Sequence, residues 1–114
     1  MKLQEISRQL SLEVRAAAEN LDRNVTGGYA SDLLSCVMAK AQPGNVWVTI
    51  QGHPNIVAVA SLLDLAGIVV AEGMSIDAAT LEKAEEENIP VLTTSLTTYT
   101  VVGELCKLGI RGVD

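Results

Sequence analysis

Histidine and cysteine, side chains often used as bases, nucleophiles and transition-metal ligands, are rare in this sequence. His53 is the single histidine, and the two cysteines, Cys36 and Cys106, lie far apart in the chain. A serine or cysteine nucleophile would need His53 as its base, yet no serine lies in a G-x-S-x-G turn. These residues also lack the spacing of a transition-metal site. The sequence therefore predicts a protein that is not an enzyme and holds no metal or other cofactor. Hydrolysis or transfer of a small substrate with His53 as base is the least favoured alternative.

The motifs that bind phosphates in larger enzymes are also missing. Gly27-Gly28 is followed by Tyr-Ala-Ser-Asp, so the lysine of a G-x-x-x-x-G-K-[ST] loop is absent. No G-x-G-x-x-G follows a predicted strand. The net charge is −6 without a basic stripe, which argues against binding to nucleic acid or to an anionic membrane surface. No apolar run reaches the roughly 18 residues of a membrane span, and the first ten residues are too charged for a signal peptide.

The spacing of apolar residues predicts the elements that would position any site. Helices are expected over residues 1–10, from Ser31 to about 41, over 55–66 with Gly67 as its C′ residue, from Asp77 to about 88, and around 101–108. Strands are expected at 12–14, before Gly27-Gly28, and at 46–50, 68–71 and 91–93.

Strands and helices alternate with short connections, which predicts right-handed crossovers. We therefore expect an α/β fold, a three-layer α/β/α sandwich with a mostly parallel central sheet. The 114 residues fit a single domain, 1–114. A hydrophobic content of 48% with only 3% aromatic residues indicates a core of aliphatic side chains, as suits helices packed on a buried parallel sheet. The cysteines have no disulfide or metal motif, which favours a reduced, cytoplasmic setting.

Polar and small residues follow several predicted strands, where open α/β sheets bind their ligands. They also precede helix N-termini, whose unpaired N–H groups attract anions. A small molecule such as a nucleotide or a phosphate ester is therefore the expected ligand. The same residue types are needed for turns and helix caps, so purely structural roles stay open. The candidate ligand residues are Thr26, Gly27, Gly28, Gln51, His53, Asn55, Glu72, Thr93 and Thr94.

The helix expected over 55–66 is unusually apolar. Within its body only Ser61 and Asp64 are polar, whereas a helix on one face of a sheet normally presents a polar stripe to water. An exposed apolar side of this size would mark an interface, and a symmetric homodimer is the commonest solution. The alternative is that another helix of the same chain covers it.

The most distinctive stretch is Asp22-Arg23-Asn24-Val25-Thr26-Gly27-Gly28. It resembles the D-R-x-x-T-G-G signature of the DRTGG domain. The resemblance covers nearly the whole chain, through the segments 31–34, 46–51, 53–60 and 71–91, and is that of a stand-alone member of the family. Asp22 and Arg23 are expected to be structural, with Arg23 holding its loop by a charge-assisted hydrogen bond.

The resemblance implies an accessory role. DRTGG domains occur between CBS domains in some pyrophosphatases and beside the catalytic part of some phosphotransacetylases. Similar domains precede the kinase part of the bacterial enzymes that phosphorylate the sugar-transport phosphocarrier protein. Kinase activity is not carried over, because this chain lacks the phosphate-binding loop. What the resemblance favours is a regulatory or sensor domain that acts through homodimerisation and a partner protein. A small-molecule binding module is the alternative.

Overall fold

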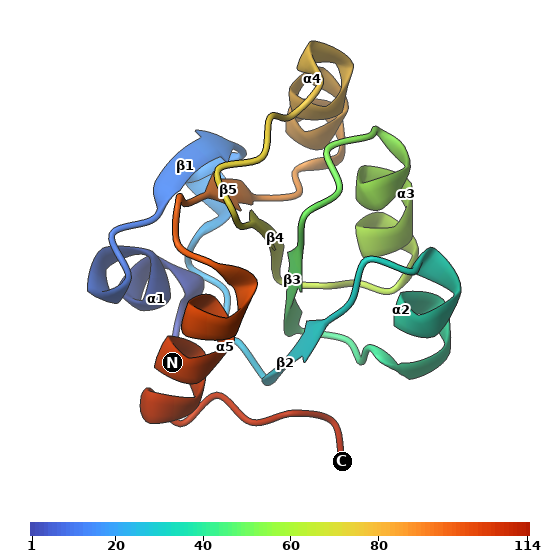
Figure 1. Cartoon of the computed structure of the whole chain (residues 1–114). Coiled ribbons are helices and arrows are strands. Elements are labelled where there is room, and N and C mark those ends of the chain that lie inside the picture. Colours follow the sequence, from blue (N-terminus) through green and yellow to red (C-terminus); the bar gives the residue numbers. More distant parts are fainter.

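The computed structural model describes all 114 residues, arranged as a five-stranded sheet between two layers of helices (Figure 1). The strand order is β1-β5-β4-β3-β2, and only β1 runs antiparallel to its neighbour. This confirms the predicted sandwich with a mostly parallel sheet. The strands are β1 (Glu13–Ala16), β2 (Gly27–Ala30), β3 (Asn45–Thr49), β4 (Gly67–Val70) and β5 (Val91–Thr93).

The helices divide between the two faces of the sheet (Figure 1). One face packs against α1 (Leu3–Gln9) and α5 (Thr98–Lys107). The other packs against α2 (Leu34–Lys40), α3 (Asn55–Leu62) and α4 (Ala78–Glu87), and a short 3₁₀ helix, η1 (Ala18–Asn20), follows β1. None of these helices has the length and apolar character needed to span a bilayer.

The central strands are buried because helices cover both of their faces. In β3, Val46 and Val48 face the layer of α1 and α5, whereas Trp47 faces the layer of α2, α3 and α4. The buried indole of Trp47 donates a hydrogen bond to the Ser31 carbonyl at 2.9 Å, which satisfies its one polar atom. Aliphatic strands therefore suffice for the core, although the chain has no phenylalanine.

Two predicted helix boundaries are wrong. The helix expected over 55–66 ends at Leu62, and Asp64 takes the left-handed conformation (φ 57°) in place of a glycine. The Leu65 N–H then bonds back to the Ala60 carbonyl at 2.9 Å and closes the helix end. Gly67 is instead the first residue of β4, where a Cβ would lie 2.8 Å from Leu3 Cδ2.

The helix expected from Ser31 also begins later, at Leu34. Ser31 does not cap its first turn directly. Its hydroxyl accepts a hydrogen bond from the Leu33 N–H within the preceding turn. The Ser31 carbonyl is used by Trp47, so this segment belongs to the packing of β2 on β3 and not to the helix.

Most of the apolar side chains of α3 are buried within the chain. Four of its aliphatic residues are buried, since α2 and α4 pack on either side of it. Ala58 and Leu62 are the apolar residues of α3 that face water, and Leu62 is 70% exposed. The intramolecular alternative therefore accounts for most of this helix.

The first predicted strand end is also wrong. Thr26, Gly27 and Gly28 were expected at the carboxyl end of a strand that precedes the glycines. β2 begins at Gly27, so these residues lie at the start of the strand. Gly27 and Gly28 pair with Asn45 and Val46 of β3, and this parallel pairing overrides the low strand propensity of glycine.

Candidate functional site

The predicted site residues lie at two opposite ends of the sheet. Because β2, β3, β4 and β5 are parallel, their first residues meet at one end and their last residues at the other. We call these the amino end and the carboxyl end. The signature residues Thr26, Gly27 and Gly28 lie at the amino end. The carboxyl end holds the remaining candidates, Gln51, His53, Asn55, Glu72, Thr93 and Thr94.

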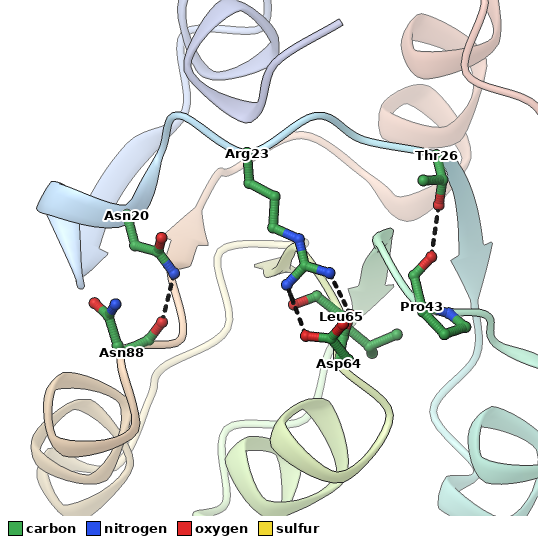
Figure 2. Close-up of polar contacts among 7 residues, drawn as sticks. All are labelled: Asn20, Arg23, Thr26, Pro43, Asp64, Leu65 and Asn88. Atoms are coloured by element: carbon green, nitrogen blue, oxygen red, sulfur yellow. Dashed lines mark hydrogen bonds and ion pairs between the residues drawn. The ribbon is translucent and has the colours of Figure 1, made fainter.

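Arg23 is the most connected polar side chain of the amino end. Its Nη1 donates to Asp64 Oδ1 at 2.9 Å and to the Leu65 carbonyl at 3.4 Å, and its Nη2 donates to the Asp64 carbonyl at 2.9 Å (Figure 2). The Leu65 carbonyl accepts from this arginine, whereas the Asp64 carbonyl also accepts from the Gly44 N–H at 2.8 Å. Asp22, by contrast, forms an exposed ion pair with Lys2 at 2.8 Å. Arg23 thus joins the segment before β2 to the turn before β4.

Thr26 and the two glycines connect further segments at the same end. The Thr26 hydroxyl donates to the Pro43 carbonyl at 2.8 Å (Figure 2). It also accepts from Asn45 Nδ2 at 3.2 Å. A Cβ on Gly27 would lie 2.9 Å from the Arg111 carbonyl oxygen, to which the Gly28 N–H donates at 2.8 Å. The signature residues therefore hold backbone segments against one another.

At the carboxyl end, the loop between β3 and α3 is bonded to the loop between β2 and α2. Gln51 Nε2 donates to the Asp32 carbonyl at 3.3 Å. The Asp32 carboxylate, which the sequence did not single out, accepts from Thr49 Oγ1 at 2.9 Å and from the Ile50 N–H at 2.8 Å. His53 Nδ1 accepts from the Asn55 N–H at 3.1 Å, in the first turn of α3. His53 thus serves the start of a helix in this structure, with no nucleophile bonded to it.

Glu72 supports the start of α5. It occupies the left-handed region (φ 66°) in a tight turn with Gly73 (φ 65°), closed by a hydrogen bond from the Met74 N–H to the Ala71 carbonyl. Its carboxylate accepts from the Thr98 N–H, the first residue of α5, at 2.7 Å. The anion-attracting end of α5 therefore already holds a carboxylate.

Gly28 lines a mostly apolar pocket described below, whereas Thr93 and Thr94 line a polar one. The polar pocket has a volume of about 480 Å³ and lies at the corner where β1, β5 and the loop after β4 meet. We call it the corner pocket. The antiparallel direction of β1 places the start of that strand beside the end of β5, with Glu13 opposite Thr93. Gly73 and Ser95, which follow predicted strands, also line the corner pocket. The remaining lining residues, which sequence reasoning missed, are Ser11, Glu13, Arg15, Met74 and Ser75.

A second pocket, of about 280 Å³, lies between β2, α5 and the last residues of the chain. Its lining is mostly apolar and includes Tyr29, Val102 and Ile110, with Lys40 and Arg111 as its cations. No three histidine, cysteine, aspartate or glutamate side chains gather where they could hold a metal ion. The corner pocket is thus the more polar of the two pockets.

The fold and the two ends of the sheet define a small α/β module with structural bonds at its amino end and a polar pocket at its carboxyl end. A family model described as the DRTGG domain matches residues 5–108. The chain belongs to the DRTGG domain family. No curated protein matches it.

Among solved structures, the chain is similar to a crystal structure of the CBS and DRTGG domains of the regulatory region of Clostridium perfringens pyrophosphatase, complexed with the activator diadenosine tetraphosphate. The TM-score is 0.68 and the sequence identity is 19%. The match covers 89% of this chain and 44% of that chain, so this protein spans less than half the length of the crystallised regulatory region.

Proposed function

We propose that this chain is a non-catalytic regulatory module that acts through a partner protein, as a homodimer in the cytoplasm. The observation that carries the proposal is the membership of the DRTGG family, because the similar solved domain belongs to the regulatory region of an enzyme. The signature residues support it, since they bond backbone segments and contact no nucleophile. The two free cysteines, Cys36 and Cys106, fit a reducing compartment.

The homodimer part rests on exposed apolar side chains of α2, of its N-cap residue Leu33 and of α3; the two helices pack side by side. Leu33 is 61% exposed, Met38 is 47% exposed and Leu62 is 70% exposed. Sedimentation at micromolar concentration tests it. We expect a particle of twice the 12.0 kDa of the monomer, and Leu62→Glu should shift it to the monomer.

Tyr99→Glu is the matched control, because Tyr99 is 90% exposed on α5, in the other helix layer. It should leave the dimer intact. A strict monomer for the wild type, or equal dissociation by both variants, would remove self-association through α2 and α3 from the proposal.

The second candidate function is a small-molecule binding module at the carboxyl end of the sheet. It is favoured by one observation, the polar corner pocket to which three separated segments of the chain contribute. A thermal-shift screen with nucleotides and phosphorylated metabolites tests it. We expect stabilisation by at least one compound, because a ligand that binds only the folded state raises its melting temperature. No shift at millimolar concentration would leave the pocket without a binding role.

A further inference from the structure

The corner pocket contains an arginine whose guanidinium group has almost no partner in the chain. The Arg15 side chain is 38% exposed, so most of it is covered by its surroundings. Its one charged neighbour is Glu13, with 4.0 Å between Arg15 Nε and Glu13 Oε1. The two terminal nitrogens make no hydrogen bond within the chain. A planar guanidinium with free donors matches two oxygens of a phosphate group at once.

Several hydroxyl groups line the same pocket as this arginine. Ser11, Ser75, Thr93 and Ser95 line the pocket, and none of their hydroxyls takes part in a hydrogen bond within the chain. Thr94 Oγ1 accepts from the Leu96 N–H at 3.1 Å, and its own proton is free to donate. At the amino end the Thr26 hydroxyl instead bonds to the Pro43 carbonyl. The pocket therefore presents several free donors beside one cation.

The walls of the pocket are held in place before any ligand binds. The Gly73 N–H donates to the Thr94 carbonyl at 3.0 Å, and the Thr94 N–H donates to the Val70 carbonyl at 3.1 Å. A Cβ on Gly73 would meet no atom within 4 Å, so space is open on that side. The volume of about 480 Å³ falls within the range of about 300–1,000 Å³ typical of small-molecule sites. Such a site has room for a phosphate and an attached organic group.

Glu13 restricts which anion fits. Its carboxylate lies in the same pocket and repels a second phosphoryl group, since the pocket offers Arg15 as its single cation. The carboxylate also accepts hydrogen bonds from hydroxyl or amino groups. Met74, 46% exposed, is the one large apolar residue that can pack against an organic part.

We propose that the corner pocket binds a phosphate monoester of a hydroxylated organic group, with Arg15 as the residue that binds the phosphate. A phosphorylated sugar and a nucleoside monophosphate share this chemistry. The inference rests on the second candidate function and names its site, its ligand class and its anchor. Glu13 and the free hydroxyls bind the hydroxyl groups of the ester.

The test is calorimetric titration of the wild-type protein at low ionic strength with four probes. They are inorganic phosphate, a hexose phosphate, a nucleoside monophosphate and the same sugar without phosphate. We expect one monoester to bind at least tenfold more tightly than inorganic phosphate and than the free sugar. The monoester that binds distinguishes the sugar from the nucleotide source.

Arg15→Ala should weaken that binding at least tenfold, and Arg15→Lys less, because lysine keeps the charge and loses the planar fork. Arg8→Ala is the matched control, since it removes the same charge from an exposed position of α1, outside the pocket. Binding by the wild type with equal affinity for Arg15→Ala would overturn the corner pocket as the site and leave the ligand-binding function standing. No binding of any probe by the wild type would overturn the ligand-binding function itself, provided that its circular dichroism spectrum shows a folded protein.

Discussion

The two arginines at opposite ends of the sheet differ in almost every contact they make. Arg23 donates three hydrogen bonds to the turn at Asp64 and Leu65. Arg15 approaches one carboxylate at 4.0 Å and is otherwise free to bind something outside the chain. Arg23 belongs to the family signature, whereas Arg15 lies outside it. The comparison teaches that the signature residues build the fold, and that a ligand site is better sought where donors are left over.

The glycines show the same difference. At the amino end a Cβ on Gly44 would lie 2.8 Å from Thr26 Oγ1, so the space is filled. At the carboxyl end, Gly52 lies against the backbone of Ser75 and Ile76, whereas Gly73 faces open space. The carboxyl end is therefore closed between β3 and β4 and open at the corner of β1 and β5.

The largest effect is expected for Gly52→Ala, which tests how tightly the closed half of the carboxyl end is packed. The new Cβ would overlap the Ser75 carbonyl and lie 3.1 Å from Ile76 Cα. The Gly52 carbonyl also accepts from Thr80 Oγ1 at 2.6 Å and from the Asp77 N–H at 3.1 Å. These bonds hold the loop after β3 and the loop before α4 together, so neither can move freely. We expect a loss of about 3 kcal/mol in the free energy of unfolding, measured with urea.

Gly103→Ala is the control for this variant. Gly103 lies inside α5 and a Cβ there would meet nothing within 4 Å, so alanine should stabilise the protein by about 0.5–1 kcal/mol. Equal stability of Gly52→Ala and the wild type would mean that the two loops are apart in solution. The carboxyl end would then be open along its whole width.

The second prediction compares the two arginines directly. Arg23→Ala removes the charged partner of the Asp64 carboxylate and leaves the Leu65 carbonyl without its donor, while the Asp64 carbonyl keeps the Gly44 N–H. The substitution should lower the free energy of unfolding by about 2 kcal/mol. Arg15→Ala removes no hydrogen bond within the chain and should change it by less than about 0.5 kcal/mol. Both values come from the same urea titration followed by circular dichroism. A loss for Arg15→Ala as large as that for Arg23→Ala would give both ends of the sheet the same structural role.

Most of the fold could be predicted from the sequence, because local patterns determine it. The β-branched run Val46–Thr49 and the apolar run after Gly67 form central strands, as expected for segments buried on both faces. Asn88, at the end of α4, takes the left-handed conformation that ends a helix. The start of β2 was misplaced because its first two residues are glycines, and only the pairing with β3 makes them a strand.

The candidate site was less predictable, because its residues meet only through strand order. The segments that carry Ser11 to Arg15, Gly73 to Ser75 and Thr93 to Ser95 adjoin since β1 inserts beside β5 in the antiparallel direction. The local pattern of residues 12–14 predicts a strand but is the same for either direction. The local sequence around Arg23 likewise does not identify Asp64, 41 residues further on, as its hydrogen-bond partner. Thr93 and Thr94 were found because they lie at the end of the predicted strand 91–93, which is parallel to its neighbour β4.

The smallest of these effects is expected for Glu72→Ala, which concerns the boundary between the closed and the open half of the carboxyl end. The substitution removes the carboxylate that accepts from the Thr98 N–H and leaves a non-glycine residue at φ 66°. We expect a loss of about 1 kcal/mol, the usual effect of losing a helix cap, in the same urea titration. Glu82→Ala, at an exposed position of α4, is the control and should change the stability by less than about 0.5 kcal/mol.

Glu72→Asn separates the two contributions of this residue. Asparagine tolerates the left-handed conformation better than alanine, but its shorter side chain does not extend as far toward the first turn of α5. A loss smaller than that of Glu72→Ala would show that backbone strain contributes, whereas an equal loss would assign the effect to the missing carboxylate. If neither variant differed from Glu82→Ala, the bond to Thr98 would add nothing to stability. Glu72 would then be as free as Arg15 to bind a ligand, and the open half would extend to the start of α5.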